Sequence, residues 1–156
     1  MAENLHTILS RRFRPRHEPA ERANLSLKEQ QTTYILNFGK RRECVSYQID
    51  GYIITDGNKC DYLILARQDG EAEWWKAIFV ELKGTDVEHA LVQLDAAMGN
   101  PVFRHSTVNE RHARIVARSF PANKANPKFE KAKRDFKTRH NCSLKQVSSG
   151  NPDRID

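Results

Sequence analysis

The clearest pattern in the sequence is a pair of apolar segments, residues 59–65 and 76–82, separated by polar residues. Both segments are rich in β-branched and aromatic side chains, which are typical of β-strands. A turn signal over residues 68–70 lies near the midpoint between Asp61 and Glu81. If the segments form an antiparallel hairpin, these two acids face each other, with Cβ atoms roughly 4.5–5.5 Å apart.

The segments before this hairpin predict a helix and one more strand. Ser26-Leu27-Lys28-Glu29 is a capping box, which predicts a helix from Ser26 to about Phe38. Residues 45–55 read as a first strand, with a bulge at Asp50-Gly51. Asp56-Gly57 then turns the chain into the segment that carries Asp61. These elements predict a three-stranded meander preceded by a helix.

The segments after the hairpin alternate between helices and strands. Thr85 to Glu88 is a second capping box, and the apolar residues that follow recur at helical spacing up to Met98, before Gly99. This pattern predicts a helix that ends at Gly99. The later elements are a strand over 114–120, a helix that begins at Asn126-Pro127 with Phe129, Ala132 and Phe136 inward and Asn141 at its end, a strand over 143–148, and a frayed tail over 150–156.

Length and charge narrow the class of protein. A chain of 156 residues favours one domain, and its net charge of +6 with a pI near 9.4 suits a polyanionic partner. Two groups of basic residues are candidates for phosphate contacts, whereas a solvated surface explains them equally well. They are Arg11, Arg12, Arg14 and Arg16 in an irregular segment over residues 1–25, and Lys40, Arg41 and Arg42 after the first predicted helix.

The cysteines and the apolar runs indicate where the protein works. Cys44, Cys60 and Cys142 are odd in number and widely spaced, so they predict neither a disulfide framework nor a zinc site. We expect them to be small buried side chains in a reducing cytoplasm. The sequence contains no run of 18 apolar residues and no secretory signal pattern, so we expect no membrane association.

The candidate chemistry lies at the end of the predicted hairpin. Two carboxylates that face each other repel, and this arrangement is destabilising unless a cation lies between them. Glu81 and Lys83 are two residues apart and therefore share a face of their strand. An exposed ion pair is the simpler interpretation of such spacing. However, the charges interrupt the most apolar strands of the chain, where a solvated pair is less expected.

The order of these elements resembles that of the PD-(D/E)xK nuclease superfamily. Cys60-Asp61 stands where that family has Pro-Asp, and Glu81-Leu82-Lys83 matches its (D/E)-x-K motif. The resemblance extends from about Ser26 to Ser148, although the motif itself rests on four residues. It implies an α/β fold with a restriction-endonuclease-like core, a mixed central sheet of element order αβββαβαβ and helices on both faces. A basic arm over 1–25 and a tail over 149–156 would flank this core.

The resemblance also implies roles for individual residues. Asp61, Glu81 and the backbone carbonyl of Leu82 would hold Mg²⁺ or Mn²⁺, and Lys83 would position or deprotonate the attacking water. Gln93 is similar to a glutamine on the following helix in some branches of the superfamily. It would orient water or phosphate, with a plain helix-surface glutamine as the alternative.

The function implied by the resemblance is that of a metal-dependent endonuclease, a phosphodiester hydrolase. DNA is the favoured substrate and RNA the alternative. Three further candidates for phosphate contacts lie on predicted strands: Lys59, Arg114 and Arg118. A small effector of a bacterial defence or repair system, acting as a homodimer or with a targeting protein, fits this size by analogy. The competing hypothesis is a non-catalytic module of the same fold that binds nucleic acid or protein.

Overall fold

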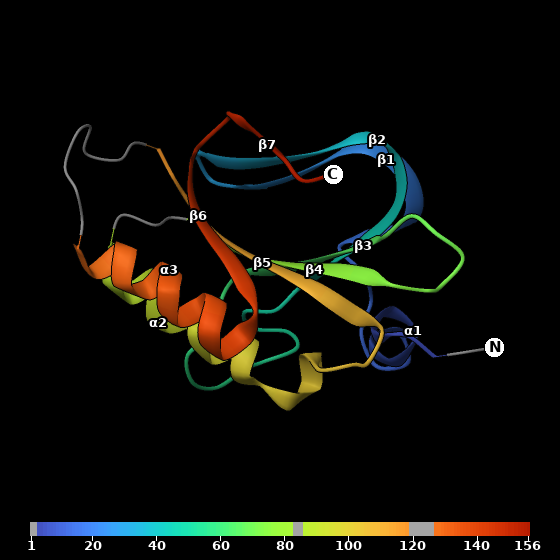
Figure 1. Ribbon diagram of the computed structural model, residues 1–156, viewed down its shortest axis with the longest axis horizontal. Coiled ribbons are helices and arrows are strands. Elements are labelled where there is room, and N and C mark those ends of the chain that lie inside the picture. Colours follow the sequence, from blue (N-terminus) through green and yellow to red (C-terminus); the bar gives the residue numbers. More distant parts are fainter. Residues whose placement is uncertain (1–2, 83–85, 119–126) are drawn as a thin grey trace.

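The protein is an α/β structure in which one open, mixed sheet of seven strands is combined with three helices, as Figure 1 shows for the computed structural model. Residues 3–82, 86–118 and 127–156 are described. The elements are α1 (Leu5–Ser10), β1 (His17–Glu29), β2 (Thr32–Gln48), β3 (Tyr62–Arg67), β4 (Trp75–Leu82), α2 (Val87–Gly99), the 3-10 helix η1 (Pro101–Phe103), β5 (Val108–Ala117), α3 (Pro127–His140), β6 (Cys142–Ser148) and β7 (Pro152–Arg154). The sheet order is β1-β2-β3-β4-β5-β6, with β7 paired to β2. The predicted α/β class and mixed sheet are confirmed.

The hairpin of β3 and β4 has the predicted register. The strands are antiparallel, and Tyr62 pairs with Val80 at one end while Arg67 pairs with Trp75 at the other. One step beyond Tyr62, this register brings Asp61 opposite Glu81, and the Asp61 N–H donates to the Val80 carbonyl at 3.1 Å. The strands β1 to β4 are joined antiparallel, whereas β4, β5 and β6 are parallel and connected through α2 and α3.

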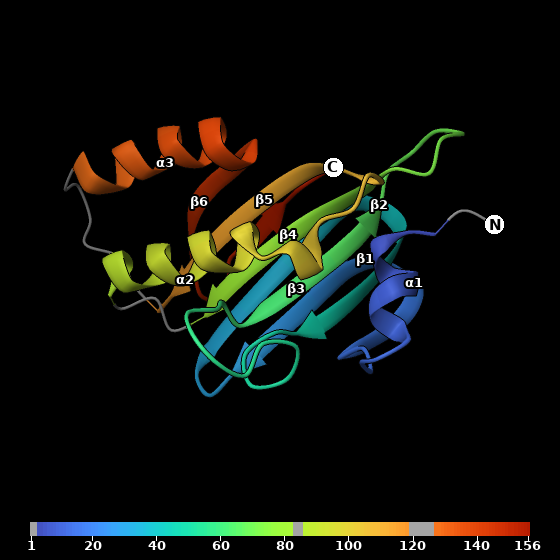
Figure 2. The same ribbon diagram turned by 90° about the horizontal axis from the view of Figure 1, so that it is seen from below.

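The three α-helices of the described residues lie on one face of the sheet, as Figure 2 shows. Leu9 of α1 and Leu94 of α2 belong to the same buried cluster as Leu63 and Phe79, whose side chains point to this face. Side chains alternate along a strand, so Ile78 and its alternate neighbours point to the opposite face. The prediction of helices on both faces is therefore wrong. No helix in the described part of the chain is long and apolar enough to cross a membrane.

The opposite face is covered by a β-hairpin that the sequence pattern misread as a helix. The predicted helix from Ser26 to Phe38 is wrong, because these residues end β1 and begin β2. Gln30 turns the chain with a φ of 50°, and the buried side chains alternate on either side of it. Leu25 and Leu27 precede the turn, while Tyr34, Leu36 and Phe38 follow it, and all five are buried in the second core cluster.

A bend near Gly39 folds this hairpin over the sheet. Gly39 has a φ of +76°, and a Cβ atom there would lie 2.8 Å from the Asp156 carboxylate, so a glycine suits both the backbone and the close approach. Before the bend the buried side chains of β2 face the second cluster; Val45 and Tyr47, after it, face the helices. The predicted strand over 45–55 is too long, since β2 ends at Gln48 and a loop follows.

Both chain ends differ from the predicted arm and tail. Residues 5–10 form α1, which buries Leu5 and Leu9, and β1 begins at His17. The described part of the predicted arm, residues 3–25, is therefore not a separate irregular segment. At the other end, β7 pairs parallel with β2. The prediction of a frayed tail over 150–156 is therefore wrong.

The elements after the hairpin match the predictions more closely. Helix α2 ends at Gly99 as predicted, but its N-cap is Asp86; Thr85 lies outside the described residues. Helix α3 begins at Pro127 and buries Phe129 and Phe136. Asn141 follows it in the left-handed conformation and donates its N–H to the Lys137 carbonyl at 3.1 Å. Strand β6 agrees with the prediction, whereas β5 begins at Val108, earlier than predicted, and residue 120 lies outside the described residues.

Candidate active site

The two predicted acids meet at the end of the β3–β4 hairpin, on the face that carries the helices. The Leu82 N–H donates to Asp61 Oδ2 at 2.8 Å, which fixes the Asp61 side chain against the end of β4. The Ile49 N–H donates to the Asp61 carbonyl at 2.8 Å and holds the following loop beside it. The sheet therefore determines the position of both carboxyl groups.

Glu81 is buried, with a relative exposure of 8%. Burial raises the pKa of its carboxyl well above the usual 4.5, and the charge of Asp61 and a hydrogen bond between the two carboxyl groups raise the pKa further. Glu81 Oε1 is fully buried and has no hydrogen-bond partner among the described residues. A buried oxygen without a partner is costly, so this atom is suited to a ligand that the described residues do not provide.

A divalent cation fits this pair of carboxylates. Hard cations take oxygen ligands, and Mg²⁺ is commonly held by one or two carboxylates, with water and substrate phosphate completing its shell. The described residues contain no group of three or more His, Cys, Asp or Glu side chains placed to hold a metal, so Asp61 and Glu81 would act as a pair. A bound cation would also be favoured electrostatically. Its positive charge would relieve the repulsion between the Asp61 and Glu81 carboxylates that raises the pKa of Glu81.

The raised pKa of Glu81 predicts how the stability of the metal-free protein depends on pH. The folded protein holds the Glu81 proton more tightly than the unfolded chain, so the free energy of unfolding falls as the pH rises above the unfolded value of 4.5. Glu81→Gln keeps the shape of the side chain but cannot ionise. We expect it to remove this pH dependence and to stabilise the metal-free protein at neutral pH. Chemical denaturation in EDTA across this pH range measures the effect.

A matched control for this measurement is Asp56→Asn, which changes an exposed carboxylate in the loop before β3. It should leave the pH dependence unchanged. Equal pH dependence in the native protein and in Glu81→Gln would contradict the description of Glu81 as a destabilising buried acid.

Gln93 and Lys59 lie beside the acid pair, but both are engaged in holding the loop that leads to it. Gln93, on α2, accepts a hydrogen bond from the Lys59 N–H at 3.0 Å through Oε1. The Lys59 ammonium donates to the carbonyls of Gly57 at 3.0 Å and Thr55 at 3.3 Å, and pairs with Asp50 at 3.8 Å. Gln93 thus fixes the position of the segment before Asp61, a role that the sequence pattern did not indicate.

Three more predicted site residues belong to the end of the sheet that carries Glu81. Leu82 ends β4 directly after Glu81, whereas Lys83 lies outside the described residues. Arg118 is exposed and follows β5. Since Leu82 pairs with Val116, Arg118 comes just past the end of the sheet where Glu81 lies. The structure therefore brings Asp61, Glu81 and Gln93 together, with Arg118 at the same end of the sheet.

The basic residues near the N-terminus follow the surface beside α1. Arg11 pairs with Glu3, and the Arg12 guanidinium lies 5.5 Å from the centre of the Phe13 ring. Arg14 and Arg16 donate their backbone N–H groups, to the Tyr52 hydroxyl and the Ser46 carbonyl respectively, both at 2.7 Å. The four side chains are exposed, on a segment whose backbone is fixed, although the Arg11 side chain is already paired with Glu3.

Comparisons with protein-family models, with curated protein sequences and with solved structures gave no match. What the site can bind follows from its own residues. One of these was missed in the sequence: Asp50, whose charge also raises the pKa of Glu81. Cys60, from the predicted motif, is fully buried beside both acids. All three cysteines are buried and free, as predicted. A charged residue in a loop that folds back onto the strand ends gives no periodic signal in the sequence.

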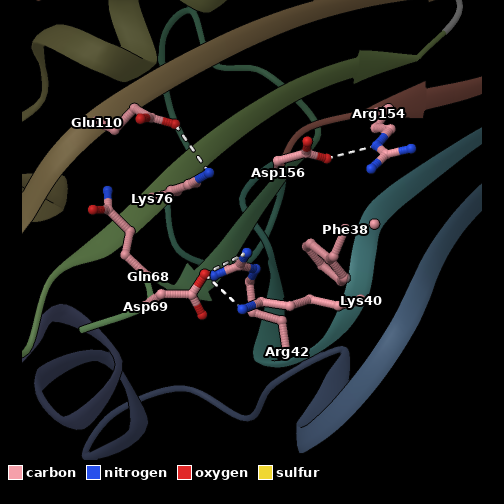
Figure 3. A pocket seen from close by; sticks show the side chains of 10 residues that line it. Phe38, Lys40, Arg42, Gln68, Asp69, Lys76, Glu110, Arg154 and Asp156 are labelled. Atoms are coloured by element: carbon pink, nitrogen blue, oxygen red, sulfur yellow. Dashed lines mark hydrogen bonds and ion pairs between the residues drawn. The ribbon is translucent and has the colours of Figure 1, made fainter. Parts of the chain in front are cut away.

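A hollow of about 450 Å³ lies at the end of β4 opposite to Glu81, between the sheet and the β1–β2 hairpin, as Figure 3 shows. Its cations are matched by carboxylates. Asp69 pairs with Lys40 at 2.7 Å and with Arg42 at 3.4 Å, and Glu110 pairs with Lys76 at 3.4 Å. Arg42 is buried and also donates to the Arg67 carbonyl at 2.9 Å, whereas Arg41 donates to the Glu21 carbonyl at 3.0 Å. The predicted basic group 40–42 therefore lies far from the acid pair along β4.

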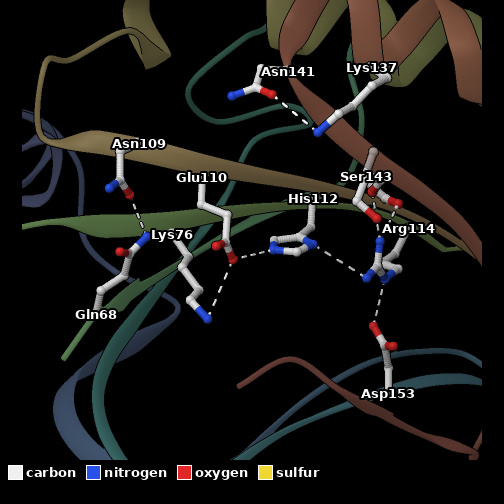
Figure 4. A network of polar contacts seen from close by, with 11 residues as sticks. Gln68, Lys76, Asn109, Glu110, His112, Arg114, Lys137, Asn141, Ser143 and Asp153 are labelled. Atoms are coloured by element: carbon white, nitrogen blue, oxygen red, sulfur yellow. Dashed lines mark hydrogen bonds and ion pairs between the residues drawn. The ribbon is translucent and has the colours of Figure 1, made fainter.

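A buried polar network continues from this hollow along β5, as Figure 4 shows. Glu110 accepts from His112 at 2.6 Å, and Arg114 Nε donates to Asp153 Oδ2 at 2.7 Å. Tyr34 donates to the same oxygen at 2.6 Å. Burial opposes ionisation of Asp153, but the hydrogen bond from Tyr34 and the charge of Arg114 outweigh it and lower the pKa of this carboxyl. Arg114, considered from the sequence as a phosphate contact, instead holds the C-terminal strand.

Proposed function

We propose that this protein is a metal-dependent nuclease that hydrolyses phosphodiester bonds, with DNA as the favoured substrate. The observation that carries the proposal is the pair of half-buried Asp61 and buried Glu81, which share a hydrogen bond and leave Glu81 Oε1 without a partner among the described residues. A surface ion pair would be solvated and would not require a ligand. A pair of carboxylates held by the sheet in an apolar setting favours a cation instead.

The proposal assigns a separate role to each of a few residues. Asp61 and Glu81 would hold Mg²⁺ or Mn²⁺, with the Leu82 carbonyl as a further oxygen ligand. The bound ion would activate water and offset charge on the phosphate. Lys83 would orient the attacking water and neutralise the phosphate, an assignment that rests on the sequence motif. Gln93 would act as a positioning residue, since its amide oxygen anchors the segment before Asp61.

The finer assignment of the fold, a restriction-endonuclease-like core, belongs to the same proposal. Its support is the succession of the antiparallel strands β2, β3 and β4, the helix α2, and the parallel strands β5 and β6 connected through α3. The acids lie on the second and third of these strands or directly beside them. The curled β1–β2 hairpin would be an addition to that core.

A non-catalytic module is the second candidate function. The observation that favours it is that Gln93 Oε1 and the Lys59 ammonium are already engaged within the protein. Such a module would bind nucleic acid or protein without cleaving it, and would bind no divalent ion at Asp61 and Glu81. A homodimer, or a targeting partner in a cytoplasmic defence or repair system, is compatible with either candidate.

Lys83→Ala tests the catalytic proposal. Removing a single charge-stabilising group from an active site typically costs about 10²–10³-fold in rate. We therefore expect the variant to cleave at least about a hundredfold more slowly in saturating Mg²⁺, while its affinity for DNA in EDTA changes little. Gel assays on single-stranded and double-stranded DNA and RNA, together with fluorescence anisotropy, measure both quantities.

Lys131→Ala is the matched control, because it removes an exposed lysine from α3. It should cleave at the native rate. Native cleavage rates in Lys83→Ala would remove this lysine from the mechanism, and the absence of metal-dependent cleavage by the native protein on every nucleic acid would favour the non-catalytic module.

A further inference from the structure

A pocket of about 400 Å³ lies on the surface between the start of β5 and the end of α3. Arg104, Arg111 and Arg139 line it, and they come from three separate segments of the chain. We call it the arginine pocket. Its other lining residues include Asn109, Asn141 and His140, and its lining contains no carboxylate. The pocket is therefore cationic, with amide groups at its edge.

Two of the three arginine side chains have no hydrogen-bond or ion-pair partner in the part of the chain that the structure describes. Neither Arg104 nor Arg111 makes a hydrogen bond or ion pair with its side chain among the described residues. Arg111 is half-buried, and both burial and the nearby charge of Arg104 lower the pKa of its guanidinium. Like charges held together in a partly desolvated pocket destabilise the protein, and a bound anion would relieve that cost.

The third arginine is held in place by an acid outside the pocket lining. Asp95, on α2, accepts from Arg139 at 3.0 Å and from His140 at 2.8 Å. Asp95 thereby ties the end of α3 to α2 and fixes Arg139 at the edge of the pocket. A guanidinium that is already positioned loses less freedom when it binds an anion.

The contrast with the hollow of Figure 3 shows why the arginine pocket is the better anion site. Arg42 and Lys76 in that hollow each lie within 3.4 Å of a carboxylate, so an incoming anion would compete with a built-in one. Arg104 and Arg111 face no such competition from the described residues. Arginine also recognises phosphate with paired hydrogen bonds, which favours phosphate over a simple halide.

We propose that the arginine pocket binds a phosphate group in the backbone of the nucleic acid. The inference rests on the proposed nuclease function. Arg111 pairs with Cys142 on the face that carries the helices, and Arg111 is near the opposite end of β5 from Ile115, which pairs with Glu81. This interval is four residues of β5, a length of about 13 Å. At about 3.4 Å per nucleotide, the contacted phosphate would lie about four nucleotides from the scissile bond.

The test is the binding of 20-nucleotide DNA, single-stranded and double-stranded, measured by anisotropy in EDTA over a range of salt concentrations. We expect the double variant Arg104→Gln with Arg111→Gln to bind at least about tenfold more weakly in 0.1 M salt. The slope of log affinity against log salt should fall by about one to two, as for the loss of one or two phosphate contacts. Arg104→Gln alone changes only an exposed side chain and should show part of the effect without risk to folding.

Arg134→Gln is the matched control, since Arg134 is an exposed arginine on α3 outside the pocket. Equal losses in Arg134→Gln and in the pocket variants would overturn the proposal in favour of diffuse charge. Native affinity in the double variant would also overturn it, even if inorganic phosphate bound to the native protein, because the source would then not be the backbone.

Failure of this inference can be distinguished from failure of the proposed function. Native cleavage in Mg²⁺, combined with native binding by the double variant, would overturn only the role of the pocket. Arginine-dependent DNA binding without any cleavage would support the pocket and overturn the nuclease assignment.

Discussion

Asp61→Asn and Glu81→Gln are each expected to reduce metal-dependent cleavage by a hundredfold or more. A bound divalent ion supplies several kcal/mol of transition-state stabilisation, and each 1.36 kcal/mol corresponds to a factor of ten in rate. The two carboxyl groups form the proposed site together, so removing one charge should disable most of it. Initial rates of cleavage in Mg²⁺ and in Mn²⁺ measure the loss.

The loss of activity in these two variants should not result from unfolding. Glu81→Gln removes a buried acid whose pKa is raised, so the metal-free variant should be at least as stable as the native protein while losing activity. Asp56→Asn, which alters an exposed acid nearby, should keep native activity. A folded Glu81→Gln variant with native cleavage rates would contradict the assignment of the site.

Asp153→Ala is expected to have the largest effect on stability. Removing this buried carboxylate leaves the Arg114 guanidinium buried without its ion-pair partner and the Tyr34 hydroxyl without its acceptor. Breaking a buried pair in this way typically costs about 3–5 kcal/mol. For a domain of this size the loss corresponds to a fall in Tm of roughly 6–20 °C. Urea denaturation and thermal melting measure it.

Asp156→Ala is the matched control for the C-terminal strand. Asp156 pairs with Arg154 on the exposed surface, so its loss should change stability little. A native free energy of unfolding in Asp153→Ala would contradict the view that Arg114 and Asp153 hold β7 against the sheet.

The lowered pKa of Asp153 also predicts how its contribution to stability depends on pH. The contribution is present above the usual aspartate pKa of 3.8 and is lost as the pH falls below it.

The sequence predicted the parts of the fold that local pattern controls. The turn near residues 68–70 fixed the register of β3 and β4, and therefore placed Asp61 opposite Glu81. Helix α2 followed from apolar spacing and from Gly99 at its end. In each case the residues that decide the structure are neighbours in the chain.

The parts that failed depend on contacts between distant residues. Ser26 to Glu29 fits a capping box, but the same segment alternates between buried and exposed side chains as the end of β1. The surface that buries Leu27 and Tyr34 comes from β3 and β4, and no pattern within residues 26–38 shows it. Likewise, the tail is ordered because Asp153 reaches Arg114, 39 residues away in the chain. The tertiary environment decided both elements.

In the candidate site, too, contacts between residues near in the chain could be predicted and contacts between distant residues could not. The pair of acids could be predicted because both lie in one hairpin with a readable turn. The roles of Gln93 and Lys59 could not, since the hydrogen bond between them joins residues 34 positions apart. The arginine pocket that contains Arg104 and Arg111 is visible only once α3 and β5 are placed together.

The measurement that tests the central claim most directly is a calorimetric titration of the native protein with Mn²⁺, repeated on Asp61→Asn and Asp56→Asn. We expect saturable binding by the native protein and by Asp56→Asn, with uptake of metal accompanied by proton release because Glu81 must ionise. Asp61→Asn should bind at least about tenfold more weakly. Equal binding by all three proteins, or no binding by the native protein at millimolar Mn²⁺, would contradict a metal site at Asp61 and Glu81.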